Sequence, residues 1–190
     1  MPESIPERLS WALETLAVEP SDRLLEIGCG NGAAVSLIGG RLTDGTITGI
    51  DRSDKMIDTA MKRNAEHVAS GKASFLAASL HEADLGQKRF DKIFAVNVNL
   101  FWMKAVRELE IVKERLSPGG AVYLFNQPPA AGKVATIVER TCLNLRDAGL
   151  HVAAVLYGDQ MQIPVACVIA TYQSSDQASR GEVPTNDIPS

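Results

Sequence analysis

A glycine cluster directly follows a short apolar run early in the chain. The run covers residues 24–27 and leads into Gly28-Cys29-Gly30-Asn31-Gly32, after which apolar residues recur at helical spacing over residues 33–42. Glycine adopts backbone conformations that other residues avoid and lets a ligand approach the main chain closely. A helix that begins behind such a loop also offers unpaired N–H groups. The order of strand, glycine loop and helix therefore predicts a ligand-binding turn at the carboxyl end of a strand.

Apolar runs and helical patterns continue to alternate beyond this turn. Further strands are expected at residues 46–50, 73–76, 90–96 and 121–125, and helices at residues 54–70, 102–116 and 134–148. The segment Ser117-Pro118-Gly119-Gly120 is expected to form the turn before the fifth strand. Two more apolar runs, 150–156 and 164–172, are separated by only seven residues, which is too short for a helical crossover and predicts antiparallel neighbours. The pattern predicts an α/β fold of three layers, with helices on both faces of a mostly parallel seven-stranded sheet that ends in an antiparallel hairpin.

The composition fits one globular domain. The chain has 190 residues, of which 45 % are hydrophobic and 22 % are charged, and these shares are close to the averages of soluble globular proteins. We expect one domain over residues 1–173, with an amphipathic helix within residues 1–22. Large apolar side chains are scarce over residues 174–190, so this stretch is expected to be a disordered tail.

Charge, cysteine content and hydropathy limit the partners and the cell compartment that can be expected for this chain. The net charge of −4 disfavours nucleic acid as a partner, because such binding depends on cations that neutralise phosphates. Cys29, Cys142 and Cys167 lack the spacing of a metal site or a disulfide framework, so no metal is expected. No apolar stretch reaches the ~18 residues of a membrane span, and the first residues lack the pattern of a signal peptide. These features together predict a cytoplasmic protein.

An acidic residue stands where a nucleoside ligand would need one. Asp51 follows the second predicted strand, twenty-three residues after Gly28, and a carboxylate can accept hydrogen bonds from both hydroxyls of a ribose. A nicotinamide or flavin dinucleotide and a single adenosine-bearing cofactor both satisfy this arrangement. The glycine spacing does not separate them, because Gly28-x-Gly30-x-x-Ala33 also fits the dinucleotide pattern.

Four separate segments carry the pattern of one protein family. They are Leu25-Glu26-Ile27-Gly28-Cys29-Gly30-Asn31-Gly32, Gly49-Ile50-Asp51-Arg52-Ser53-Asp54-Lys55-Met56, Phe90-Asp91-Lys92-Ile93 and Leu116-Ser117-Pro118-Gly119-Gly120. In this order they resemble the first motif, the second motif, the start of the fourth strand and the turn before the fifth strand of class I methyltransferases. The expected closing hairpin is similar to that family's antiparallel seventh strand. The resemblance covers roughly residues 24–172, and it implies a three-layer Rossmann-like sandwich with S-adenosyl-L-methionine as the cofactor.

The resemblance also implies a role for individual residues. The backbone of residues 28–32 would hold the methionine part of the cofactor, Asp51 would accept from the ribose hydroxyls, and Met56 with Arg52 would pack on the adenine. Ser79 stands where family members often have an aspartate that accepts from the adenine amino group, so it would accept without a charge. Asn97, at the end of the fourth strand, would lie beside the sulfonium and is the expected catalytic residue. The full set expected at the cofactor is Glu26, Gly28, Cys29, Gly30, Gly32, Asp51, Arg52, Met56, Ser79, Leu80 and Asn97.

The expected function is methyl transfer from S-adenosyl-L-methionine to a small-molecule acceptor by in-line displacement. The sulfonium is already a strong electrophile, so the protein's main contribution would be to place the acceptor and exclude water. The alternative function is that of a non-catalytic subunit that binds the cofactor and activates or stabilises a partner. A third possible function is that of a nicotinamide-dependent reductase. His81 is a candidate general base, and Phe101 with Trp102 either wall a substrate pocket or begin the next helix. A homodimer is left open.

Overall fold

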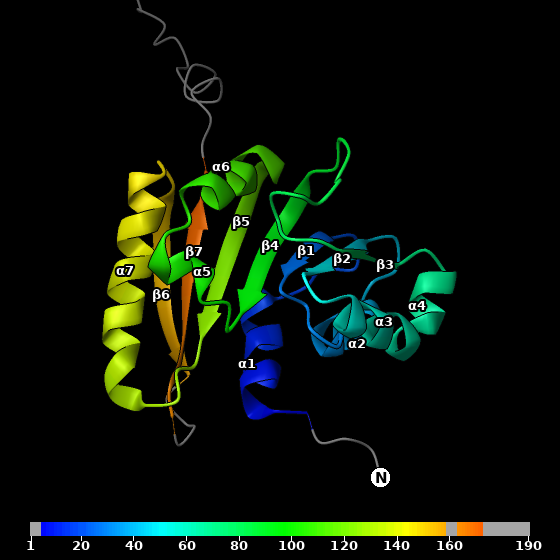
Figure 1. Cartoon of the computed structure of the whole chain (residues 1–190), viewed down its shortest axis with the longest axis horizontal. Coiled ribbons are helices and arrows are strands. Elements are labelled where there is room, and N and C mark those ends of the chain that lie inside the picture. The colour runs from blue at the N-terminus through cyan, green and yellow to red at the C-terminus, as the bar shows by residue number, and fades with distance from the viewer. Residues whose placement is uncertain (1–4, 159–162, 173–190) are drawn as a thin grey trace, which may run out of the picture.

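The computed structural model describes residues 5–158 and 163–172. Seven strands form a single sheet in the order β3-β2-β1-β4-β5-β7-β6 (Figure 1). Their bounds are β1 (Arg23–Ile27), β2 (Thr46–Asp51), β3 (Ala73–Ala77), β4 (Phe90–Val96), β5 (Leu116–Asn126), β6 (His151–Gly158) and β7 (Val165–Thr171). The pairs among β1 to β5 are all parallel, whereas β7 is antiparallel to both β5 and β6. The predicted mixed sheet is therefore confirmed, and the predicted tail at residues 174–190 lies outside the described residues.

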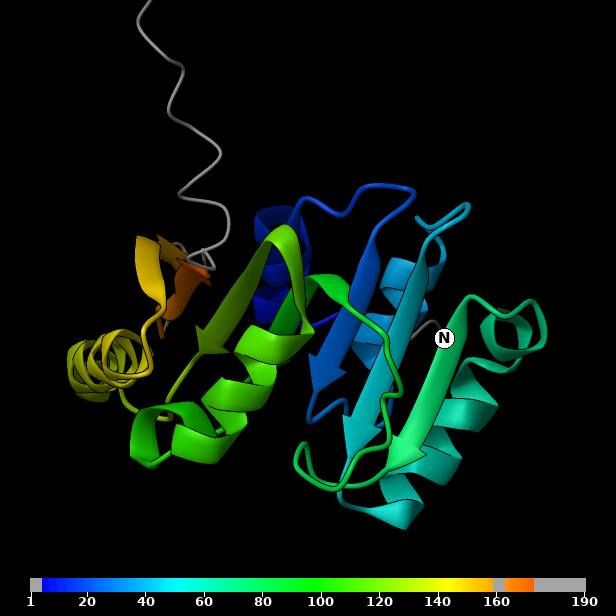
Figure 2. The same ribbon diagram turned by 90° about the horizontal axis from the view of Figure 1, so that it is seen from above.

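Helices cover both faces of the sheet. One face carries α1 (Glu7–Leu16), α2 (Ala33–Gly39), α3 (Asp54–Arg63) and α4 (Ala65–Ala69), and the other carries α5 (Leu100–Met103), α6 (Val106–Arg115) and α7 (Val134–Asp147), which the short 3-10 helix η1 (Ala131–Lys133) precedes. Figure 2 shows the two groups on opposite sides of the strands. Each group encloses its own buried cluster, with Leu13, Ile38 and Ile57 on the α1 face and Phe101, Leu109 and Leu145 on the α7 face. The three predicted layers are confirmed.

Two helices predicted as continuous are each broken in the structure. The helix expected over residues 54–70 divides at Asn64, which leaves helical geometry (φ −107°, ψ 23°) and directs its side-chain amide to the carbonyl oxygens of Gly32 and Ala60 at 3.1 and 2.8 Å. The helix expected over residues 102–116 divides at Lys104, whose backbone is extended. Phe101 and Ala105, which flank this break, are both 1 % exposed. In both places a buried tertiary contact outweighs the helical pattern of the sequence.

The predicted Ser-Pro-Gly-Gly turn lies within a strand. β5 begins at Leu116, which pairs with Phe90, and the next pair joins Ala121 to Lys92. Five steps along β5 thus match two steps along β4, so the four turn residues bulge out of the ladder. Gly119 has a φ of +79° at this bulge, a conformation that L side chains rarely adopt. The turn exists, but the strand begins before it.

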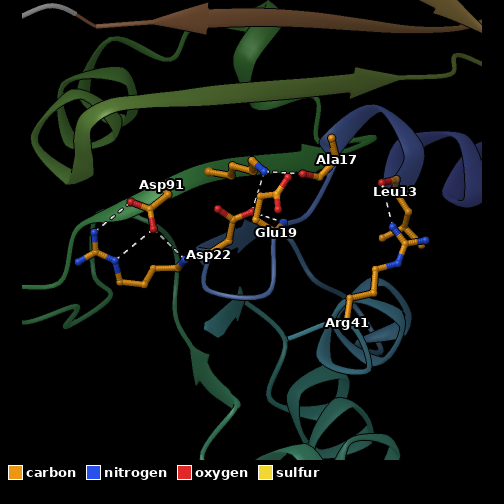
Figure 3. Close-up of polar contacts among 8 residues, drawn as sticks. Leu13, Ala17, Glu19, Asp22, Arg41 and Asp91 are labelled. Atoms are coloured by element: carbon orange, nitrogen blue, oxygen red, sulfur yellow. Dashed lines mark hydrogen bonds and ion pairs between the residues drawn. The ribbon is translucent and has the colours of Figure 1, made fainter. Parts of the chain in front are cut away.

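Ion pairs join the amino ends of β1 and β4 (Figure 3). Lys92 Nζ lies 2.6 Å from Asp22 Oδ2 and donates to the carbonyl oxygen of Ala17 at 2.7 Å, and the Glu19 N–H donates to the same Asp22 oxygen at 2.7 Å. Both side chains of the ion pair are largely buried, with 14 % and 12 % of their surface exposed. Beside them, Arg23 and Asp91 form a two-point ion pair. We refer to Asp22, Arg23, Asp91 and Lys92 as the amino-edge network.

Candidate active site

Two hollows lie at the carboxyl ends of the central strands and share Gly28 and Val96. The α1 hollow, about 400 Å³ in volume, extends from these residues to the first turn of α1 and the start of α2. The β2 hollow, about 570 Å³, extends the other way to the ends of β2 and β3. Both are formed where the parallel strands end and the winding of the sheet reverses, which is the usual ligand position in such folds.

The three glycines of the loop differ in the space around their Cα atoms. Gly28, Gly30 and Gly32 all have positive φ, at 74°, 51° and 72°. A Cβ on Gly28 would lie 2.6 Å from Val98 Cγ2, and one on Gly32 would lie 2.9 Å from the Cβ of Ala60, whereas a Cβ on Gly30 would meet no atom within 4 Å. Gly28 and Gly32 are therefore needed for packing as well as for backbone conformation. Gly30 faces open space, so a side chain there would be strained by the backbone conformation and not by a neighbouring atom.

Asp51 is held in place by the backbone around it. Its Oδ2 accepts from the N–H of Gly30 at 2.9 Å, and its Oδ1 accepts from the N–H of Ser53 at 3.0 Å. The same turn is fixed by the N–H groups of Gly28 and Cys29, which both donate to the carbonyl oxygen of Ile50 at 2.8 and 2.9 Å. Asp51 lines the β2 hollow, and each carboxylate oxygen can accept more than one hydrogen bond. A pair of ligand hydroxyls can thus bind to a carboxylate that is already oriented.

Glu26 is a buried acid with an oxygen that has no partner. It stands on β1, is 4 % exposed and lines the α1 hollow. Among the described residues, nothing donates a hydrogen bond to its Oε2. Burial, and secondarily the negative charge of Asp51, raises the pKa of Glu26 well above its ordinary value. A buried acid in this state is suited to a cationic ligand group, whose charge would offset the loss of hydration.

Cys29 contributes its backbone and not its thiol. Its sulfur packs on Gly49, where an added Cβ would lie 3.0 Å from it. Burial raises the pKa of the Cys29 thiol, and the charges of Glu26 and Asp51 raise it further. Because the thiolate is the reactive form of cysteine, this side chain is inert at neutral pH.

Ser79 and Leu80 lie at the far end of the β2 hollow. The Ser79 hydroxyl donates to the Glu82 carboxylate, and this hydrogen bond lowers the pKa of Glu82. His81 Nδ1 lies 3.2 Å from the same hydroxyl and 3.9 Å from Glu108 Oε1 of α6. Leu80 is buried in the core and also lines the hollow. Ser79 therefore keeps oxygen lone pairs with which it can accept from a ligand, and its expected role at the adenine stays a prediction.

Asn97 links two strand ends. Its φ is +57°, which asparagine tolerates better than most residues. Its Oδ1 accepts from the N–H of Gln127 at 2.7 Å, and its own N–H donates to the carbonyl oxygen of Phe125 at 2.8 Å. The side chain lines the β2 hollow while its amide oxygen joins the end of β4 to the end of β5. Its expected catalytic role stays a prediction.

Most of the predicted residues meet at the two hollows, and a few lie outside their linings. Glu26, Gly28 and Cys29 line the α1 hollow, and Gly28, Asp51, Arg52, Ser79, Leu80 and Asn97 line the β2 hollow. Gly30, Gly32 and Met56 line neither, and Met56 is 42 % exposed on the first turn of α3. Phe101 is 1 % exposed and packs in the core, so it begins a helix and does not wall a pocket. Trp102 lies on the same short helix α5 and lines neither hollow.

Sequence reasoning missed four residues at the site. Val98 covers Gly28, and the amide of Asn64 fixes the glycine loop through the carbonyl oxygen of Gly32. Arg8 and Arg63 line the α1 hollow from α1 and α3. Only Asn64 gave a signal, because it is a polar residue in an apolar helical stripe. The two arginines are too far apart in the chain for any spacing to connect them.

Within the described ranges, no group of three or more histidine, cysteine or acidic residues could hold a metal ion. No described helix is both long and apolar enough to cross a lipid bilayer.

Comparisons with known proteins agree with this geometry. Residues 24–120 match the family described as "Methyltransferase domain". The chain is 28 % identical over 149 residues to 27-O-demethylrifamycin SV methyltransferase of Amycolatopsis mediterranei, a match that covers 77 % of this chain and 53 % of that protein. The first curated relatives are matched over 65 %, 49 % and 45 % of their own length, so the chain covers less than two thirds of each.

Two solved structures have a similar fold. A structure of a SAM-dependent methyltransferase from Aquifex aeolicus superimposes with a TM-score of 0.71 at 18 % identity, over 85 % of this chain and 88 % of that one. The [4+2]-cyclase SpnF superimposes with a TM-score of 0.68 at 17 % identity, over 85 % of this chain and 79 % of that one. At such low identity the likeness concerns the fold alone.

Proposed function

The chain belongs to the methyltransferase-domain family, and from this premise we propose that it transfers a methyl group from S-adenosyl-L-methionine to a small-molecule acceptor by in-line displacement. One observation carries the proposal: two acidic residues lie in two hollows that meet at Gly28. Asp51 is an oriented carboxylate, and Glu26 is a buried acid whose Oε2 has no partner among the described residues. A nucleoside joined to an amino acid has matching groups, two hydroxyls at one end and an ammonium at the other.

The residues present fit this cofactor. The ribose hydroxyls would bind Asp51, and the adenine would lie between Arg52 and Leu80, with Ser79 accepting from its amino group. Met56 would reach the adenine only by a change of side-chain conformation, because it does not line the hollow. The ammonium of the methionine end would bind Glu26, and the thioether would cross the shared wall at Gly28.

The cofactor supplies an electrophilic methyl group when it is bound. The chain's own residues would position the acceptor in line with the departing sulfur and exclude water from the hollows. Asn97 is the expected positioning group, since it lines the β2 hollow next to the shared wall. No histidine or acidic residue occurs over residues 97–102, so positioning, and not proton removal, is the expected mechanism at this segment.

A small acceptor agrees with the short connections at this end of the sheet. Only seven residues separate Asn126 from Val134, and η1 occupies three of them, which leaves little chain to form a large substrate domain. The Amycolatopsis relative is named for a small-molecule acceptor, a demethylrifamycin. Three further expectations stay predictions. They are that the protein does not bind nucleic acid, that it is cytoplasmic and that it can form a homodimer.

The alternative is a subunit that binds the cofactor without transferring its methyl group. The bond between Asn97 Oδ1 and the Gln127 N–H favours it, because an oxygen used in this way is less available to orient an acceptor. The fold itself agrees with either reading, since a [4+2]-cyclase has a similar structure.

Two measurements test the proposal. Calorimetry with S-adenosylhomocysteine and with NADH identifies the cofactor, and incubation with radiolabelled S-adenosylmethionine and a cell extract detects transfer. Binding of S-adenosylhomocysteine with label in a small product supports the proposal. Binding without transfer supports the subunit, and binding of NADH alone would overturn both readings.

A further inference from the structure

The strand β6 forms one edge of the sheet and lacks the usual features that prevent edges from pairing. Within the described residues it pairs only with β7, so its outer side has no neighbouring strand. Its eight residues include no aspartate, glutamate, lysine, arginine or proline. Natural edge strands are commonly short, charged or interrupted by proline, because a bare edge pairs readily with other chains. The outer side of β6 is therefore suited to pairing with another strand.

Apolar side chains are exposed on both faces of this edge. Leu156 and Tyr157 are 42 % and 52 % exposed, and as consecutive residues of a strand they point to opposite faces. The other edge strand, β3, has five residues and carries none of the large apolar side chains that are exposed in the described part of the chain. A partner docked on one face of the sheet would cover one of the two β6 side chains, whereas a strand paired with β6 covers the flank of both.

The helix α7 presents two opposite charges beside this edge. It packs on both β6 and β7, and Figure 2 shows it at the end of the sheet with α5 on its inner side. Asn144 of α7 donates to the carbonyl oxygen of Phe101 in α5, which fixes the inner side of α7. Glu139 and Arg146 lie about 140° and 160° around the helix from Asn144, so they belong to its outer side. Both are exposed, and neither forms an ion pair within the described ranges.

We propose that β6 pairs antiparallel with β6 of a second copy of this chain, so that two seven-stranded sheets join into one. The pairing has a twofold axis perpendicular to the sheet beside Val155, and such an axis makes each strand the antiparallel neighbour of the other. With Val155 opposite its counterpart, Leu156 lies opposite the small Ala154 of the second copy. Leu156 and Ala154 pair with Cys167 and Ile169 of β7, so they share one face and the match keeps each face intact.

The same axis places the two α7 helices side by side. Neighbouring strands are about 4.8 Å apart and α7 lies over β6 and β7, so the two helix axes are about 10 Å apart, near the roughly 8–10 Å of packed helices. The helices run antiparallel, so Arg146 of each copy is presented to Glu139 of the other. A second copy is therefore a better occupant than an unrelated protein, because each copy supplies both charges of a self-complementary stripe.

The association in solution tests this surface. We would measure the monomer–dimer Kd of the full chain by sedimentation, together with Leu156→Lys, which places a charge on the edge strand. Met61→Lys is the matched control, because Met61 is 44 % exposed on α3, a helix that packs on β2 and β3 at the other end of the sheet. Glu139→Arg and Arg146→Glu each place like charges opposite one another, and the double variant restores opposite charges.

The full chain is expected to sediment as a dimer. Leu156→Lys should raise the dimer Kd by more than about tenfold, because two like charges meet near the axis, and Met61→Lys should leave it unchanged. Each charge reversal should raise the Kd by about 3- to 10-fold, since the symmetry disrupts two ion pairs at once. The double variant should return the Kd to within about twofold of the full chain, because the two reversals compensate each other.

Other results would overturn the proposal. A full chain that is a monomer at every concentration excludes it, and if removal of residues 173–190 then produced a dimer, the chain's own tail would be the occupant of the edge. A dimer that Leu156→Lys and both charge reversals leave unchanged forms through another surface. If Leu156→Lys does not fold, the charge reversals decide the question, because both residues are exposed on a helix. Neither hollow is lined by a residue of β6 or α7, so the result is separate from cofactor binding.

Discussion

The two edges of the sheet partner most of their polar groups differently, although the buried Nε of Arg115, directly before β5, also has no hydrogen-bond partner among the described residues. At the amino edge, Lys92 has two partners and Asp91 has a two-point bond to Arg23. At the carboxyl edge, the Oε2 of Glu26 and the Oδ1 of Asn64 are buried and have no hydrogen-bond partner among the described residues. Positive φ occurs at both edges, at the three loop glycines and Asn97 on the carboxyl side and at Ala17 and Gly119 on the amino side.

The difference separates residues that stabilise the fold from residues kept for a ligand. A buried polar atom without a partner destabilises the empty protein by roughly 1–3 kcal/mol, and strained backbone adds to this. Such groups persist where a ligand satisfies them. The comparison predicts that substitutions at the amino edge change stability alone, whereas substitutions at the carboxyl edge change binding, with or without a change in stability.

The largest effect is expected for Gly32→Val. A Cβ here would lie 2.7 Å from Asn64 Nδ2 and 3.1 Å from the Cα of Ala60, at a φ of +72°, so the free energy of unfolding should fall by about 4 kcal/mol. Gly30→Ala is the control, because its Cβ meets no atom, and it should lose only ~1–2 kcal/mol from strain. Urea unfolding measures both. Equal losses in the two variants would contradict this difference between the glycines.

A pair of aspartates tests the comparison directly. Asp51→Ala should weaken S-adenosylhomocysteine binding by roughly 2–4 kcal/mol, because two hydroxyl bonds to a charged acceptor are lost. Asp22→Ala should leave that affinity unchanged and reduce the free energy of unfolding by about 3 kcal/mol, because Lys92 loses its buried partner. Calorimetry measures the affinity for S-adenosylhomocysteine and urea unfolding measures the stability, each for both variants. A binding defect in Asp22→Ala would break the separation of the two edges.

The two edges should also respond to pH with opposite signs. Burial raises the pKa of Glu26, so its contribution to stability is present below its unfolded pKa and is lost as the pH rises towards its folded value. Although burial alone would raise the pKa of Asp91, hydrogen bonds from Arg23 and Ser117 hold it below its ordinary value, so its contribution is lost as the pH falls. Each group changes the free energy of unfolding by at most about 1.4 kcal/mol per pH unit.

Glu26→Gln and Asp91→Asn isolate these two effects. Unfolding by urea between pH 4 and 8 should show a decline in the wild type that is absent in Glu26→Gln. Between pH 2 and 5, Asp91→Asn should lack the acid-dependent loss that the wild type shows. If both variants keep the wild-type slopes, other groups determine the pH dependence and the contrast is wrong.

The smallest effect is expected for His81→Ala. His81 lies at the rim of the β2 hollow near Ser79 and Glu108, and no proton transfer is assigned to it. Once an acceptor is known, the turnover rate should fall by less than about tenfold, below the ~10² to 10⁴ expected for an essential general base. Asn97→Ala, measured beside it, should lower turnover by roughly 10²-fold if it positions the acceptor. Complete loss of transfer in His81→Ala, with normal cofactor affinity, would establish a base-assisted reaction instead.

The sheet was predictable because its signals are local. Apolar runs bounded by turns located the strands to within a few residues, except for the start of β5, which lies five residues before the predicted one. The short interval before β7 predicted its antiparallel direction. Asp51 was predictable for the same reason, since the end of β2 fixes its place.

The missed features depend on contacts between distant residues. The helix break at Asn64 depends on the carbonyl oxygen of Gly32, and the bond from Gln127 to Asn97 depends on the alignment of β4 with β5. Arg8 and Arg63 share a hollow only because α1 and α3 lie on the same face of the sheet. No spacing or propensity encodes such pairs, because they follow from the assembled fold.

The position of β7 affects the order in which the protein can fold on the ribosome. β7 lies between β5 and β6 although it is the last of the seven described strands to be synthesised. Until residue 171 has left the exit tunnel, one edge of β5 is unpaired and β6 has no neighbour in the sheet. Exposed strand edges pair readily with other chains, so the nascent chain passes through an aggregation-prone stage that ends only when β7 inserts. Slower translation before β7 should therefore lower the soluble yield, whereas faster translation should raise it.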